Sequence, residues 1–73
     1  MEPYLTEREK NVLTLLALGC TNKEISEKLH ISIHTTKAHL ESIYEKWNVT
    51  NRVQAVIKAI SLNKIKIQDI LPD

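Results

Sequence analysis

Residues 21–49, TNKEISEKLHISIHTTKAHLESIYEKWNV, decide the fold of this chain. They predict two helices, over 22–29 and 33–47, that are separated by a short turn. Thr21 is the expected N-cap of the first helix, because a glutamate three residues later completes a capping box, and Ser32 is the expected N-cap of the second. A short helix followed by a longer one that exposes small and polar side chains is typical of a helix-turn-helix that reads DNA.

The turn between these helices consists of His30, Ile31 and Ser32. Because it contains no glycine, we expect right-handed backbone throughout it. We also expect Ile31 to drop into the core.

The flanking sequence predicts two further helices, over 7–18 and 52–62. Thr6 and Asn51 are their expected N-caps, and Gly19 stands where a left-handed residue ends the first of them. The chain has one glycine and two prolines, both near the ends, so its interior lacks helix breakers. We therefore predict an all-α fold, a four-helix bundle that contains a helix-turn-helix.

Length and composition limit the domain organisation and the class of function. We predict one domain over residues 1–62 and a C-terminal extension over 63–73 that is partly docked or flexible. A chain of 73 residues buries only about 60% of the surface that it exposes when unfolded, which leaves no room for an enzyme cleft. A hydrophobic content of 42% over the whole chain shows that the chain is not itself an intrinsically disordered segment.

The charge balance does not indicate non-specific nucleic-acid binding. Ten basic and nine acidic residues give a net charge of +1, so any case for DNA must rest on local geometry. Cys20 is the single cysteine and cannot form an internal disulfide. No apolar run is long enough for a signal peptide or a membrane span, so we expect a cytoplasmic protein without membrane contact.

The helix over 33–47 has two contrasting faces when its residues are spaced at about 100°. The inward stripe consists of Ile33, Thr36, Leu40, Ile43, Tyr44 and Trp47. The opposite face consists of His34, Ala38, Glu41, Ser42 and Glu45. Because alanine lies at the middle of the exposed face, this helix can approach another surface closely.

The helix over 52–62 is more apolar than one core requires. Its apolar residues cover an arc of about 220°. The expected wet side holds only Gln54, Lys58 and Ser61. The excess predicts a second apolar face for two-fold self-association, and we assign that interface to Val53, Ile57 and Ile60.

With these helices in place, the sequence resembles the LuxR-type (GerE-like) helix-turn-helix domains of bacterial transcription regulators. The resemblance spans residue 5 to about residue 60, and it rests on several landmarks at matching spacing. These landmarks are LTERE at 5–9, TNKEI at 21–25, IS at 31–32 with TTKAH at 35–39, IYEKWNV at 43–49 and NRVQAV at 51–56. Region 4 of sigma factors opens similarly, but the NRVQAV helix fits it poorly.

The resemblance implies that the third helix enters the major groove and that the fourth pairs two copies on a roughly palindromic site. The resemblance also implies that Lys37, Ala38 and Glu41 face base edges, and we add His34 to this set. It implies that Asn22, Lys23, Thr35 and His39 lie near phosphates, and we add Thr21 to that set.

The chain departs from the family pattern at several positions. Thr36 and Trp47 stand where the family has aliphatic residues, and Ser26 stands where alanine is common; we expect Thr36 to bond back to a carbonyl one turn earlier and Trp47 to fill a larger volume. Glu41 faces the groove as an acid, which is repelled by phosphate but can accept from cytosine N4. The third helix has no net charge, because Lys37 and Lys46 balance Glu41 and Glu45, so we expect two copies to be needed for useful affinity.

Metal and enzyme sites are not expected. His30 and His34 straddle the turn, and His34 and His39 project in different directions, which argues against a metal site. We find no carboxylate pair in an apolar setting, no phosphate loop and no nucleophile beside a histidine; the only aspartates, Asp69 and Asp73, lie in the tail. We expect no cofactor.

We therefore predict sequence-specific binding of double-stranded DNA by a homodimeric bacterial transcription regulator, with RNA polymerase as a further candidate partner. The alternative is a helical protein-interaction module that has the same fold and does not bind DNA. The sequence is compatible both with a complete small regulator and with the output domain of a longer one, such as a response regulator.

Overall fold

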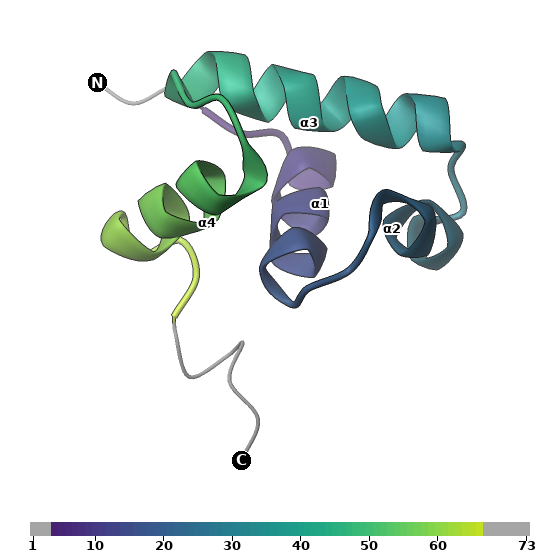
Figure 1. Cartoon of the computed structure of the whole chain (residues 1–73), viewed down its shortest axis with the longest axis horizontal. Coiled ribbons are helices and arrows are strands. Elements are labelled where there is room, and N and C mark those ends of the chain that lie inside the picture. The colour runs from purple at the N-terminus through teal and green to yellow at the C-terminus, as the bar shows by residue number, and fades with distance from the viewer. Residues whose placement is uncertain (1–3, 67–73) are drawn as a thin grey trace.

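The computed structural model describes residues 4–66 (Figure 1). These residues form four helices, α1 (Glu7–Ala17), α2 (Asn22–Leu29), α3 (Ile33–Trp47) and α4 (Arg52–Ser61). In Figure 1, α3 runs along the top, α1 lies beneath it, and α2 and α4 flank α1. Helix α1 packs against the other three helices. The predicted all-α bundle with a helix-turn-helix is thereby confirmed over the described part of the chain.

Each helix begins at the N-cap that the sequence predicts. Thr6 and Thr21 form capping boxes with a glutamate three residues later. Ser32 and Asn51 accept the backbone N–H groups of the third residues of α3 and α4. These contacts satisfy backbone donors that have no partner within the helix.

Two helices end one residue earlier than predicted. We expected helices over 7–18 and 52–62, but Leu18 and Leu62 are C-cap residues outside α1 and α4. The chain reverses direction immediately after each of them, at Gly19 and Asn63, and these turns set the limits of the helices.

All four helices end on the same backbone turn. The residue that reverses the chain has a positive φ in each case: Gly19 (92°), His30 (56°), Asn48 (54°) and Asn63 (57°). The next N–H then donates to the carbonyl five residues earlier, in the pairs Cys20 to Leu15, Ile31 to Ser26, Val49 to Tyr44 and Lys64 to Ala59. This is the Schellman arrangement, which satisfies carbonyls at the end of a helix.

The prediction of right-handed backbone throughout the turn between α2 and α3 is therefore wrong. His30 adopts the left-handed conformation at φ 56° and ψ 44°, although this costs a residue other than glycine about 1–2 kcal/mol. The bond from Ile31 N to Ser26 O, at 3.0 Å, satisfies a carbonyl that would otherwise lack a partner and helps to offset that cost. Ile31 is half-buried and does not enter the central core.

The core lies where α1 meets the other helices. Its buried hydrophobic residues are Leu5, Val12, Leu13, Leu16, Ile25, Leu40, Ile43, Trp47, Ala55, Ala59 and Ile65. Trp47 is 1% exposed, so the large side chain that was expected to fill a larger volume is fully enclosed. Thr36 is also buried, and its hydroxyl donates to Ser32 O at 3.1 Å, as predicted.

Two large apolar residues at helix ends are exposed, and one of them, Ile33, was expected in the inward stripe of α3. Ile33 is 44% exposed and Leu18 is 51% exposed. A helical side chain covers the turn that precedes it; as the first residue of α3, Ile33 has no such turn to lie against. Leu18 is displaced because it lies beyond the end of α1.

The sequence predicts that Lys58 lies on the solvent-exposed side of α4, and this prediction is wrong. It is half-buried, and its Nζ donates to the Trp47 carbonyl at 2.9 Å. A lysine there satisfies a carbonyl at the C-terminus of α3 and complements the helix dipole.

Beyond α4, Ile65 is buried against the core. The predicted division into residues 1–62 and an extension over 63–73 stays a prediction, because residues 67–73 lie outside the described part, as do residues 1–3. None of the described helices has the length and apolar character needed to cross a membrane.

Candidate nucleic-acid interface

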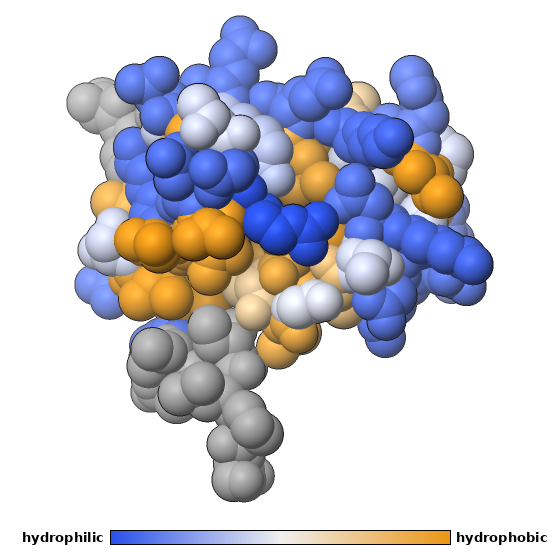
Figure 2. Space-filling view, viewed as in Figure 1, coloured by the Kyte–Doolittle hydropathy of each residue, from blue (hydrophilic) through white to orange (hydrophobic). Residues whose placement is uncertain are grey.

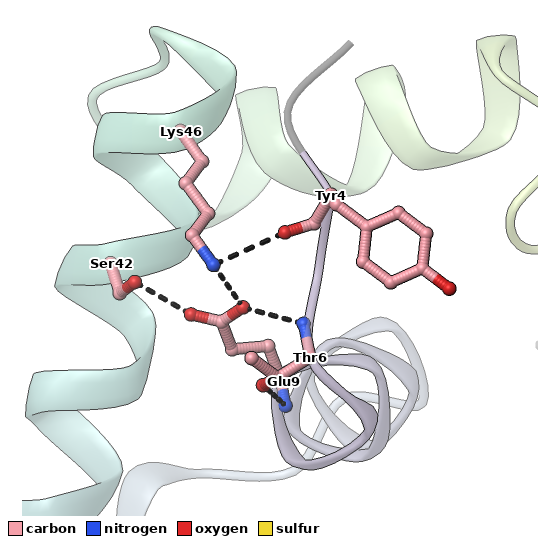
Figure 3. A network of polar contacts seen from close by, with 5 residues as sticks. All are labelled: Tyr4, Thr6, Glu9, Ser42 and Lys46. Atoms are coloured by element: carbon pink, nitrogen blue, oxygen red, sulfur yellow. Dashed lines mark hydrogen bonds and ion pairs between the residues drawn. The ribbon is translucent and has the colours of Figure 1, made fainter.

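A polar cluster around Glu9 fixes α3 on α1 (Figure 3). The Glu9 side chain is buried and accepts from Lys46 Nζ at 2.7 Å, from Ser42 Oγ at 2.6 Å and from Thr6 N at 2.8 Å. Lys46 Nζ also donates to Tyr4 O at 3.2 Å. The C-terminal half of α3 is thus held by its polar side as well as by the core.

The pKa of Glu9 reflects this environment. Burial raises the pKa. The hydrogen bonds from Lys46, Ser42 and the Thr6 backbone, together with the Lys46 charge, lower it by more than burial raises it, and the resulting pKa is about 2. The carboxylate is therefore ionised at neutral pH.

The sequence did not reveal this cluster. The helical wheel places Ser42 on the exposed face of the third helix, whereas Ser42 is half-buried. The available signal was that Ser42 and Lys46 are four residues apart and so share a face of α3.

The structure gathers the predicted base-contacting residues on one exposed face of α3. His34, Lys37, Ala38 and Glu41 are all exposed. They lie opposite Thr36, Leu40, Ile43 and Trp47, which are buried. Because α3 is held from behind along most of its length, this face can meet a partner as a rigid surface.

The predicted phosphate-contacting residues lie at the starts of α2 and α3 and on one flank of α3. Thr21 and Lys23 are exposed, whereas Asn22, Thr35 and His39 are half-buried. The Thr21 hydroxyl accepts from Glu24 N at 3.1 Å, and the Thr35 hydroxyl accepts from Ser32 Oγ at 2.9 Å. Both hydroxyl groups therefore already accept a hydrogen bond at the N-terminus of a helix.

The exposed face of α3 is more acidic than the sequence indicated. Lys46 is drawn into the ion pair with Glu9, so Lys37 is left with Glu41 and Glu45 on the exposed side. Positive charge next to this face must come from other helices.

An open hollow of about 230 Å³ lies beside the exposed face of α3. It is lined by Asn22, Lys37, Leu40, Glu41, Tyr44 and Arg52. Arg52 is the first residue of α4, and its Nη2 donates to Asn22 Oδ1 at 3.2 Å. This arginine was not among the site residues predicted from the sequence. The feature that could have drawn attention to it is its rarity, because Arg8 and Arg52 are the only two arginines in the sequence.

The second apolar face of α4 is present. Val53 is 63% exposed and Ile57 is 61% exposed, whereas Ile60 is half-buried. Figure 2 shows hydrophobic surface over α4 and mostly hydrophilic surface along α3. Two large apolar side chains one turn apart are available for a partner.

No group of three histidine, cysteine, aspartate or glutamate residues that could hold a metal ion occurs within residues 4–66.

Comparison with known proteins gives a match along most of the chain. The family model of the bacterial regulatory proteins of the luxR family, GerE, matches residues 3–59. YhjB of Escherichia coli (strain K12), an HTH-type transcriptional regulator by name, is 51% identical over 53 residues, which are 73% of this chain and 26% of YhjB. The response regulator protein VraR of Staphylococcus aureus (strain NCTC 8325) is 47% identical over 62 residues, which are 85% of this chain and 30% of VraR.

The chain spans less than a third of the length of these relatives. By name both are regulators. The family model covers the capping box of α1, the helix-turn-helix and most of α4. This chain belongs to the luxR family of bacterial regulatory proteins.

Proposed function

We propose that this chain is the DNA-binding domain of a bacterial transcription regulator and that α3 enters the major groove of a specific site. One observation carries the proposal: α3 presents an exposed polar face with Ala38 at its middle, while its opposite face is buried in the core. A rigid helix with a small residue at the centre of its free face suits the width of the major groove.

The proposed base contacts follow from side-chain chemistry. Lys37 donates to guanine O6 and N7, and Glu41 accepts from the N4 amino group of cytosine. Ala38 offers close apolar contact to a thymine methyl group, and His34 extends the same surface toward the start of α3. Because Glu41 is repelled by phosphate, this face favours selectivity over affinity.

The proposed phosphate contacts surround this face. Lys23 lies in the first turn of α2, where its charge opposes the helix dipole; a nearby phosphate would reverse that penalty. Thr21, Asn22, Thr35 and His39 are the other proposed contacts. Contacts of this kind fix the register of a protein on the duplex and carry no sequence information.

We further propose that two copies bind a roughly palindromic site through α4. The support is the exposure of Val53 and Ile57, with Ile60 beside them. A single α3 face with one lysine and two glutamates neutralises little phosphate charge, so a second copy supplies affinity that one domain lacks.

The length of the relatives supports a wider proposal. Since this chain corresponds to less than a third of YhjB and VraR, we infer that the domain works as the output part of a longer cytoplasmic regulator. A contact with RNA polymerase stays a prediction, and we assign no surface to it.

Selection of binding sites from random DNA duplexes tests the proposal. The chain should enrich one sequence with two related half-sites, and its affinity for that sequence should fall steeply as the salt concentration rises. If no duplex is enriched and binding does not respond to salt, the domain is a protein-interaction module and the proposal is wrong.

A further inference from the structure

Arg52 joins the start of α4 to the start of α2. Its Nη2 donates to Asn22 Oδ1 at 3.2 Å, and its Nη1 donates to Cys20 O at 3.4 Å. The two acceptors lie on either side of Thr21, the N-cap of α2. The guanidinium therefore contacts the N-terminus of α2 at two points, in the fork geometry for which arginine is suited.

These contacts determine which way the Asn22 amide points. A guanidinium group can only donate hydrogen bonds, so the amide oxygen of Asn22 must face Arg52. The amide NH2 group is turned away, and it has no hydrogen-bond partner within residues 4–66. It can still donate two hydrogen bonds, which a phosphate oxygen can accept.

The position of this amide relates it to the proposed DNA-binding face. Asn22 and Arg52 line the open hollow beside α3 together with Lys37 and Glu41. A duplex whose base edges meet Lys37 and Glu41 would carry its sugar-phosphate backbone along the border of that face. Asn22 lines the hollow and therefore lies on this border.

The local energetics of α4 do not explain the arginine. A positive charge in the first turn of a helix is unfavourable with the helix dipole. Arg52 is also exposed, so its aliphatic part adds little to the core. Its hydrogen bonds go to the start of α2 instead.

We propose that Arg52 is a positioning residue for DNA binding: it holds the Asn22 amide with its NH2 group directed at a phosphate of the bound duplex. This inference rests on the proposed DNA-binding function and adds to it a residue from α4. Because Arg52 acts through Asn22, each of the two side chains should be of little use without the other.

A double-mutant cycle tests this dependence, with affinity measured on the duplex selected by the wild-type chain. Asn22→Ala and Arg52→Ala should each weaken binding about tenfold, the loss expected for one hydrogen bond to a charged group. The double variant should also lose about tenfold, because the contact can be lost only once. Arg52→Lys keeps the charge without the fork and should recover little of the affinity.

The salt dependence distinguishes positioning from a direct phosphate contact. If Arg52 acts only through Asn22, Arg52→Ala should change the slope of log affinity against log salt by less than about half a unit. Arg8→Ala is the matched control, because it removes the same charge from the first turn of α1, outside the hollow; it should leave affinity nearly unchanged. Thermal unfolding of every variant verifies that it is folded.

Several results would overturn the positioning role. They are a double variant that loses about a hundredfold, a slope that falls by about 0.9 in Arg52→Ala, and full recovery in Arg52→Lys. In each case the wild-type chain still binds its site, so the proposed function survives. If the wild-type chain selects no duplex, the proposed function fails and this inference fails with it.

Discussion

Glu9 of α1 and Lys46 of α3 form an ion pair with 2.7 Å between Oε1 and Nζ, and the Glu9 side chain is only 5% exposed. The same carboxylate caps the start of α1 through Thr6 and accepts from Ser42 on α3. The Glu9 side chain therefore satisfies a backbone N–H group at the start of α1, and it also orients the helix that carries the proposed base-contacting face. Its removal should affect both stability and DNA binding.

Replacement of Glu9 by glutamine should lower the free energy of unfolding by about 1–3 kcal/mol, because hydrogen bonds to a charged acceptor are lost in a buried site. Lys46 is 31% exposed, so its charge stays partly hydrated and the loss should be at the lower end for a buried ion pair. Chemical denaturation measures the effect. Glu24→Gln is the matched control, because it alters the corresponding capping box of α2 at an exposed residue. It should lower the free energy of unfolding by less than about 1 kcal/mol.

The same carboxylate should make stability dependent on pH in the acid range. The pKa of Glu9 is lowered from 4.5 to about 2 in the folded chain, so the folded state binds fewer protons than the unfolded state between these values. The stabilisation is complete above pH 4.5 and is lost as the pH falls through about 2, and such a shift corresponds to roughly 3 kcal/mol. The difference in unfolding free energy between wild type and Glu9→Gln should shrink along this range; a constant difference would contradict the assignment.

Replacement of His30 by glycine should stabilise the fold. His30 holds φ at 56°, which costs about 1–2 kcal/mol in a residue with a β-carbon, whereas glycine loses about 0.5–1 kcal/mol through chain entropy. We expect a net gain of about 0.5–1 kcal/mol in thermal or chemical unfolding. Asn48→Gly should gain less, because asparagine tolerates this conformation. Destabilisation by His30→Gly would mean that the imidazole contributes a contact worth more than the strain.

The double variant Val53→Glu, Ile57→Glu should weaken self-association and DNA binding together. Both side chains are more than 60% exposed, so the monomer should keep its helices and its melting temperature. Sedimentation equilibrium and DNA titration measure the two effects. Leu18→Glu places one glutamate at another exposed apolar residue and should change neither. An unfolded double variant would place both residues in the core and remove the basis of the dimer proposal.

Lys37→Ala should weaken binding to the selected site by about 1–3 kcal/mol and relax the preference at one base pair, if Lys37 contacts a guanine. Lys28→Ala removes an exposed lysine from the last turn of α2 and serves as the control. Titration against the selected site and against single-base variants of it measures both properties. Unchanged affinity together with unchanged preference would refute the contact.

Much of the fold was accessible from the sequence because its signals are local. The N-caps Thr6, Thr21, Ser32 and Asn51 act within three residues of themselves. The inward and outward faces of α3 follow from the helical period, and Thr36 and Trp47 are buried as the pattern predicts. The helical period misplaced Ile33 at the start of α3, and it also misplaced Ser42 and Lys58, which are half-buried because their polar groups bind partners on other helices.

Four helices and their starts follow from the sequence alone, because capping and periodicity depend on neighbours a few residues apart. Only the tertiary structure decided the pairing of Glu9 with Lys46 and the bridge from Arg52 to Asn22. These contacts join residues more than 25 positions apart, and a helical wheel cannot show which charge on one helix meets which on another. The packing of α1 and α4 against the rest of the bundle brings these partners within hydrogen-bonding distance, and it thereby sets which polar groups remain free to meet DNA.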